Sequence, residues 1–124
     1  MRSERVTAAE QVAFRRRVEA AIRRDDPREL ADVALEIALE STEREWAQSC
    51  CVQLARHRDP CVRGSALVGL GHLARRFGQL DPQRVKRVVE NGLWDRNEHV
   101  QRQAQSAADD LATFLRWEFE GPSG

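Results

Sequence analysis

Three cysteines and one histidine lie within twelve residues of each other, and such side chains can bind zinc or serve as a nucleophile and its base. They are Cys50, Cys51, His57 and Cys61. Structural zinc sites use paired ligands two to five residues apart, whereas adjacent helical residues point about 100° apart. A hydrolase would also need a histidine facing the thiolate, and none is spaced to face Cys61. The sequence therefore predicts no metal, no cofactor, no catalytic residue and no small-molecule substrate.

Acidic side chains form a second group that could bind a charged partner. Four of them recur every three or four residues on one predicted helix, and a fifth follows just after its end: Glu29, Asp32, Glu36, Glu40 and Glu43. Like charges at this spacing each destabilise a helix by about 0.2–0.5 kcal/mol. One interpretation is a solvated face that arginines of the preceding helix balance. The other is a docking strip for a basic protein, which would use Glu36, Glu40 and Glu43.

A third group lies near the end of the chain and combines two carboxylates with an aromatic side chain. Asp109 and Asp110 come shortly before Trp117. Tryptophan is frequent among the residues that dominate protein interfaces, so we predict that this corner contacts a partner. The alternative for Asp110 is a structural ion pair with Arg63 that joins neighbouring helical hairpins.

Helix start and stop signals divide the sequence into six helices. Thr7 and Glu10 have capping-box spacing, as do Thr42 and Glu45, and Gly78 can end a helix in the left-handed conformation. Further caps are predicted from Asp or Asn, three of them followed by proline: Asp26, Asp59, Asp81 and Asn97. The predicted helices span about residues 8–24, 27–40, 43–56, 60–77, 82–94 and 98–115.

The apolar residues of these segments recur at spacings of three and four, which is the period of a helix buried on one side. No alternating strand pattern is present, so we expect an all-α fold without a sheet. The helix from Asp59 to Gly78 has the fullest stripe, and we expect the other helices to pack around it. The prediction requires buried side chains at four positions: Val62, Leu70, Val100 and Leu111.

Length and charge restrict the class of protein. A chain of 124 residues is expected to form one domain, here residues 1–120, with a mobile tail at 121–124. No long apolar run or leader is present, which predicts a cytoplasmic protein that does not enter membranes. Twenty basic and twenty acidic residues cancel, which disfavours nucleic-acid binding. The cluster Arg15–Arg17 with Arg23 and Arg24 is the only feature that favours it.

An internal repeat relates the helical pairs. Trp46 lies 39 residues before Val85, and Val62 lies 38 before Val100. Two helices per unit at this period are typical of an α-solenoid, here one of three antiparallel hairpins. The central unit resembles the D-x-x-V-R-x-x-A-x-x-x-L core of HEAT repeats through Asp59, Val62, Arg63, Ala66 and Leu70. The last unit departs from it, with Asn97 and Gln101 in place of the Asp and Arg.

Structural roles are expected for three charged residues. We expect Asp59, Arg63 and Asp81 to hold the scaffold, the two aspartates at helix starts and Arg63 between repeats. The HEAT resemblance covers residues 42–115.

A narrower resemblance concerns small bacterial HEAT-like proteins, some of which occur beside polymorphic toxins as immunity proteins. Several short motifs carry it: Arg63-Gly64, Gly69-x-Gly71-His72-Leu73-Ala74-Arg75, Gly78-x-Leu80-Asp81, Ala108-Asp109-Asp110-Leu111 and Phe114. The resemblance implies a protein that neutralises a toxin domain by binding it, without catalysis. The alternative is a scaffold or adaptor that assembles a larger complex and inhibits nothing.

Overall fold

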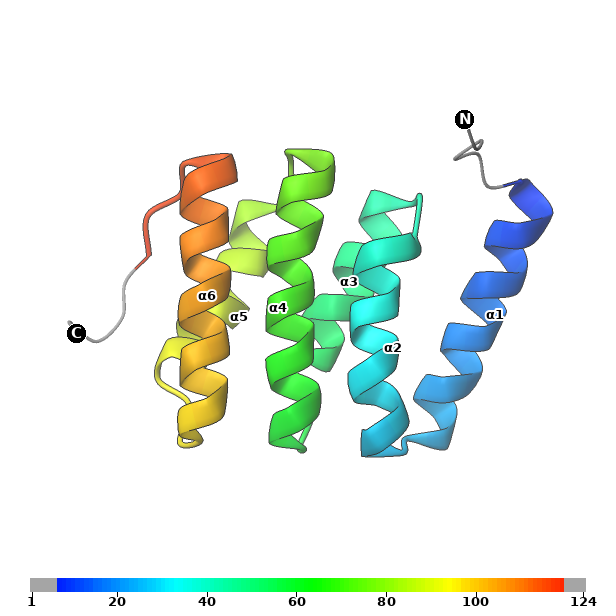
Figure 1. The fold of residues 1–124 in the computed structure, drawn as a ribbon, viewed down its shortest axis with the longest axis horizontal. Coiled ribbons are helices and arrows are strands. Elements are labelled where there is room, and N and C mark those ends of the chain that lie inside the picture. The colour runs from blue at the N-terminus through cyan, green and yellow to red at the C-terminus, as the bar shows by residue number, and fades with distance from the viewer. Residues whose placement is uncertain (1–6, 120–124) are drawn as a thin grey trace.

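The computed structural model describes residues 7–119, and this part of the chain consists of six α-helices and no strands (Figure 1). The helices are α1 Ala8–Arg24, α2 Pro27–Glu40, α3 Arg44–Leu54, α4 Pro60–Phe77, α5 Pro82–Leu93 and α6 Glu98–Leu115. The all-α prediction is confirmed. The expected mobile tail at 121–124 lies outside the described residues. None of the helices in 7–119 combines the length and the apolar character needed to cross a membrane.

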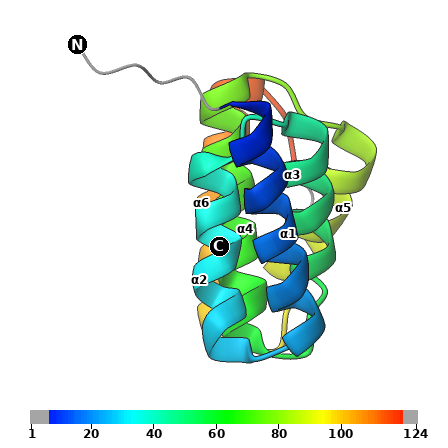
Figure 2. The ribbon, with the colours of Figure 1, turned by 90° about the vertical axis from the view of Figure 1, so that its right-hand side faces the viewer.

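The helices form antiparallel hairpins that stack side by side. Helices α2, α4 and α6 make a row that faces the viewer in Figure 1, and we call it the front row. Helices α3 and α5 lie behind this row, and α1 closes its end beside α2, as the side view in Figure 2 shows. Since α4 lies in the middle, it contacts α2, α3, α5 and α6.

Five of the six helices begin at a side chain that accepts a backbone hydrogen bond. Thr7 and Glu10 form the predicted capping box, with distances of 3.0 and 2.9 Å. The other four helices begin at the predicted Asp and Asn caps: Asp26, Asp59, Asp81 and Asn97. These bonds satisfy N–H groups that have no partner within a helix.

The predicted capping box at Thr42 is wrong. The cap of α3 is Glu43, whose side chain makes no capping hydrogen bond. The hydroxyl of Thr42 instead donates to Gln11 Oε1 over 2.6 Å, and its backbone N–H donates to the same oxygen. A side chain 31 positions earlier thus competes with the local bond.

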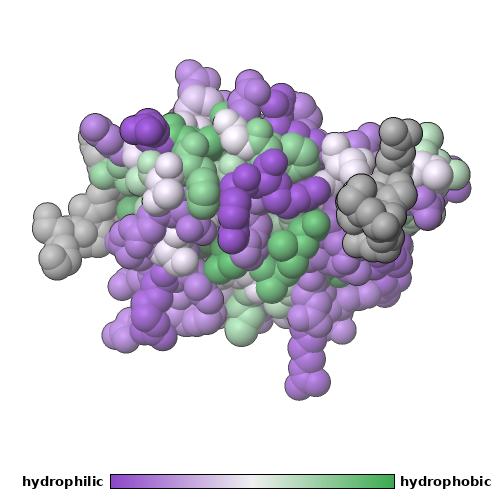
Figure 3. All heavy atoms as spheres, turned by 45° about the horizontal axis from the view of Figure 1, so that its top comes forward, coloured by the Kyte–Doolittle hydropathy of each residue, from purple (hydrophilic) through white to green (hydrophobic). Residues whose placement is uncertain are grey.

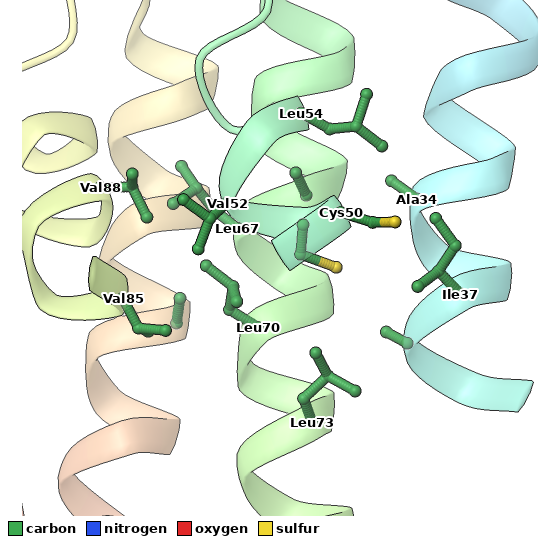
Figure 4. Close-up of a cluster of buried hydrophobic side chains, with 14 of the residues drawn as sticks. Ala34, Ile37, Cys50, Val52, Leu54, Leu67, Leu70, Leu73, Val85 and Val88 are labelled. Carbon is green, nitrogen blue, oxygen red and sulfur yellow. The ribbon is translucent and has the colours of Figure 1, made fainter. Parts of the chain in front are cut away.

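The core is continuous across the hairpins and centres on α4 (Figure 4). Leu67, Leu70 and Leu73 of α4 point toward side chains from both neighbouring sides, among them Ile37 of α2 and Val85 of α5. The four side chains that the sequence predicts to be buried are fully buried: Val62, Leu70, Val100 and Leu111. Helix α4 is buried on more than the one predicted stripe, because helices pack on several of its sides.

Glycines allow the front row to pack closely. A Cβ atom at Gly69 would lie 3.2 Å from the Cβ of Ala38 in α2, and one at Gly71 would lie 2.5 Å from Asp110 Oδ2 in α6. Glycine costs about 1 kcal/mol relative to alanine inside a helix, so close packing must compensate for it. The two residues let α2 and α6 approach α4 from opposite sides.

Polar side chains tie consecutive hairpins together at both ends of the helices. Gln48 of α3 is buried and its Oε1 accepts the N–H of Asp81 over 2.7 Å, which repeats the bond of Gln11 one hairpin later. At the opposite end, Asp25 accepts hydrogen bonds from His57 and Arg58 at 2.6 Å each. The same kind of bond thus recurs along the stack.

The ion pair of Arg63 belongs to these ties, but its partner differs from the predicted one. Arg63 Nε and Nη2 donate to the two carboxylate oxygens of Asp95 at 2.9 and 3.0 Å, and Nη1 donates to the carbonyls of His57 and Arg58. The alternative of a pair with Asp110 is therefore wrong. Asp95 lies in the loop before α6, at the helix ends that Arg63 can reach.

Candidate partner-binding face

The acidic residues of α2 lie mainly on the side that faces α1. Glu36 forms an ion pair with Arg17, and Glu29 forms one with Arg24, at 3.1 and 2.6 Å. Glu43 pairs with Arg15 at 3.0 Å. The interpretation as a balanced solvated face accounts for these three residues. The other two acidic residues, Asp32 and Glu40, are exposed and have no ion pair within residues 7–119.

The pairs also occupy three of the five α1 arginines that could contact phosphate, namely Arg15, Arg17 and Arg24. Arg15 and Arg17 further stack on Trp46 and Phe14, with guanidinium carbons 5.2 Å from each ring centre. Exposed ion pairs contribute little stability, but they reduce the local positive charge.

The predicted partner residues of the last hairpin lie at the other end of the front row. Asp109 is exposed and accepts a hydrogen bond from Gln105, and Asp110 lies against α4 at Gly71. Trp117 follows α6 and packs partly buried beside Phe119. Helix α4 separates these residues from the acids of α2. The six predicted residues thus form two groups and not one patch, and their contact with a partner stays a prediction.

The solvent-facing side of the front row is a third candidate surface, which we call the front face. Each helix contributes one row of accessible side chains at spacings of three or four: Ala31, Leu35 and Leu39; Ser65, Val68, His72 and Arg75; Ser106, Asp110 and Phe114. Charged side chains border these rows at the same spacing, among them Asp32 of α2, Arg76 of α4 and Arg102 and Asp109 of α6, so the face combines apolar and charged groups.

A cluster around Arg75 joins α4 to α6 on the front face. Arg75 Nη2 donates to His72 Nδ1 over 2.6 Å, and the guanidinium carbon lies 5.9 Å from the ring centre of Phe114. Within residues 7–119 the guanidinium makes no other hydrogen bond. Asp110 occupies the space beside the missing side chain of Gly71. The cluster holds an exposed cation in place while leaving most of its donors open.

Burial holds His72 in the form that this hydrogen bond needs. Burial lowers the pKa of His72, Arg75 lowers it further, and Asp110 raises it in part. The neutral imidazole therefore persists at physiological pH, with Nδ1 as an acceptor and the proton on Nε2.

Large apolar side chains flank the cluster. Leu39 is 54% exposed at the end of α2, and Phe114 is 43% exposed at the end of α6. Arg76 donates to the carbonyls of Ala38 and Ser41, which places the last turn of α4 beside that of α2. Figure 3 shows hydrophobic atoms gathered near the middle of this end and face, with hydrophilic atoms around and between them. Sequence periodicity missed Leu39, because it lies outside the buried stripe of α2.

The cysteines lie in packed or separate positions, and no group of three or more metal-ligating side chains converges among the described residues. Cys50 and Cys51 are buried in α3, while Cys61 is exposed in the first turn of α4. Burial raises the pKa of the Cys50 thiol to about 11, with a further increase from Glu19, and burial also raises the pKa of Cys51 strongly.

We expect a thiol reagent such as DTNB to modify Cys61 alone in the folded protein. Access is required for modification, and a thiolate is the reacting species. Mass spectrometry should find one label at Cys61 under native conditions and three in denaturant. Cys61→Ser should take up no label while folded. Rapid native labelling of Cys50 or Cys51 would contradict the packing of α3.

Comparison with known proteins gives one relevant similarity. No protein-family model and no curated protein sequence matches this chain. The fold is similar to a chain in the crystal structure of a CDI complex from Cupriavidus taiwanensis LMG 19424, with a TM-score of 0.69 and 28% sequence identity. The similarity covers 92% of this chain and 97% of that chain, so it concerns the whole helical stack.

Proposed function

We propose that this protein is a cytoplasmic immunity protein with HEAT-like repeats that binds a cognate toxin domain and neutralises it by occlusion. The observation that carries the proposal is the similarity, over nearly the full length of both chains, to a chain of a CDI complex. CDI denotes contact-dependent inhibition, in which a toxin is paired with an immunity protein.

The helical stack supports a binding function. Hairpin stacks expose extended surfaces on fixed helices, and such surfaces usually bind other macromolecules. Of the side chains that could do chemistry, Cys50 and Cys51 are buried, and Cys61 is exposed. The nearby His57 is bonded to Asp25 and to the N–H of Asp59 and not to the Cys61 thiol. We therefore assign the protein a partner and no reaction of its own.

Growth protection tests the proposal. The product of the adjacent reading frame, tested as the toxin, would be expressed from an inducible promoter, with this chain or an empty vector in the same cells. We expect growth arrest with the empty vector and restored growth with this chain. A catalytically inactivated toxin would control for the burden of expression.

Two outcomes would contradict the immunity function. Continued arrest when both proteins accumulate in soluble form would remove it. A stable complex in which the toxin stays active would instead support the scaffold alternative, because that protein would bind without inhibiting.

A further inference from the structure

One end of the front face combines exposed apolar side chains with a cation whose donors are largely open. This end, near Phe77, carries the guanidinium of Arg75 between two exposed apolar side chains, Leu39 and Phe114. The neighbouring Arg76 already donates to backbone carbonyls of α2 and its C-terminal cap. The acids of α2, by contrast, are largely neutralised within the protein by α1. The acids therefore have less charge to offer a partner than their number suggests.

The surroundings of Arg75 limit the entropy that binding would cost. A free arginine side chain loses rotamer entropy when it is fixed. Here the bond to His72 and the stacking on Phe114 already restrict the guanidinium. Arginine with open donors next to an aromatic ring is a composition typical of interface hot spots.

Charge complementarity indicates what such a group would bind. The open N–H donors of a planar guanidinium match the two oxygens of a carboxylate. Leu39 and Phe114 would contact apolar side chains around that carboxylate and exclude water from the ion pair. Leu35 and Val68 extend the apolar area along the front row.

We propose that the toxin domain docks on the front face, with a carboxylate side chain of the toxin bound to Arg75 and apolar neighbours of that carboxylate packed on Leu39 and Phe114. This inference rests on the proposed function and adds the contact surface and the chemistry of the partner. It places the centre of the interface on α4 and α6 and not on the paired acids Glu36 and Glu43.

Binding of the purified, inactivated toxin domain by calorimetry tests this assignment. Arg75→Met removes the cation and Phe114→Ala removes the ring, and we expect each to weaken binding by about 30-fold, as hot-spot residues do. Leu39→Ala should weaken it by about 10-fold. Each variant should keep the helical circular dichroism and unfolding midpoint of the natural protein, since these side chains are exposed.

Matched controls separate this face from the rest of the surface. Arg87→Met removes an exposed arginine from α5, which lies behind the front row, and Trp94→Ala removes a ring that is 66% exposed at the opposite helix ends. Both should bind within threefold of the natural protein.

The outcomes distinguish the possible failures. Unchanged affinity of Arg75→Met and Phe114→Ala, with tight binding of the natural protein, would overturn the assignment and leave the proposed function standing. A larger loss in Trp94→Ala or Arg87→Met would overturn it in favour of another surface. If the protein forms a dimer that Phe114→Ala dissociates, the front face binds a second copy of this chain and the proposed toxin contact is overturned. Absence of binding by the natural protein would refute the proposed function itself.

Discussion

Leu70→Ala is expected to lower the free energy of unfolding by about 2–5 kcal/mol, the range for fully buried leucines. Leu70 is fully buried in α4, the helix against which four others pack. Its removal would leave a cavity where side chains of several hairpins meet (Figure 4). Domains of this size are usually stable by 5–15 kcal/mol, so the loss is a large fraction.

Urea unfolding followed by circular dichroism measures this effect. Leu39→Ala is the matched control, because it makes the same truncation at a side chain that is 54% exposed. We expect Leu39→Ala to change stability by less than about 0.5 kcal/mol. A Leu70→Ala variant as stable as Leu39→Ala would show that α4 is not the centre of the core.

Asp95→Asn is expected to destabilise the protein by about 1.5–3 kcal/mol at neutral pH, since it weakens charge-assisted hydrogen bonds. Asp95 accepts two bonds from Arg63 and one from the N–H of Asn97. Burial alone would raise the pKa of Asp95, but the bonds from Arg63 and Asn97 outweigh it and lower the pKa below its ordinary value of 3.8.

The lowered pKa predicts how the difference between the two proteins depends on pH. Because the unfolded state binds the proton more readily, the carboxylate stabilises the folded state above about pH 4, the unfolded pKa. This contribution is lost as the pH falls through the folded pKa of Asp95. The stability gap between the natural protein and Asp95→Asn should therefore be full at pH 7 and shrink below pH 4.

Unfolding curves at several pH values measure the gap. Asp109→Asn is the control, because Asp109 is exposed and accepts only from Gln105 within the described residues. We expect the free energies of unfolding of the natural protein and Asp109→Asn to stay within about 0.5 kcal/mol of each other at every pH. A gap for Asp95→Asn that does not change between pH 7 and pH 3 would show that the Arg63 pair does not stabilise the fold.

Local signals predicted the helices well, because caps and breakers act over three or four residues. Asp59 with Pro60 begins α4 and Gly78, with a φ of 67°, ends it as expected. The error at Thr42 arose from a partner outside that range, since Gln11 binds its hydroxyl. Cap prediction thus fails where a distant side chain competes for the same group.

Pairings between hairpins could not be predicted in the same way. Arg63 reaches Asp95 and not Asp110, because the choice depends on which helix ends meet in the stack. Side-chain periodicity shows which face of a helix a residue occupies. It does not show which residues of a neighbouring helix lie at the same level along the helix axis. The partner of an ion pair therefore requires the packed structure.

The candidate surface shows the same limit. Acids at Glu36 and Glu43 stand out in the sequence, yet α1 arginines bind them in the fold. Nothing in the sequence marks Leu39 as exposed, and Phe114 stands out only through the family resemblance. The stacking of α2, α4 and α6 brings their surroundings onto one face. Exposed apolar residues cannot be recognised until the buried stripe is known.

The central claim, that this protein acts by binding a toxin domain, is tested most directly by mixing the two purified proteins. Size-exclusion chromatography with light scattering should show a one-to-one complex that survives dilution to nanomolar concentration. Two separate peaks at the masses of the individual proteins, with both proteins folded, would contradict it.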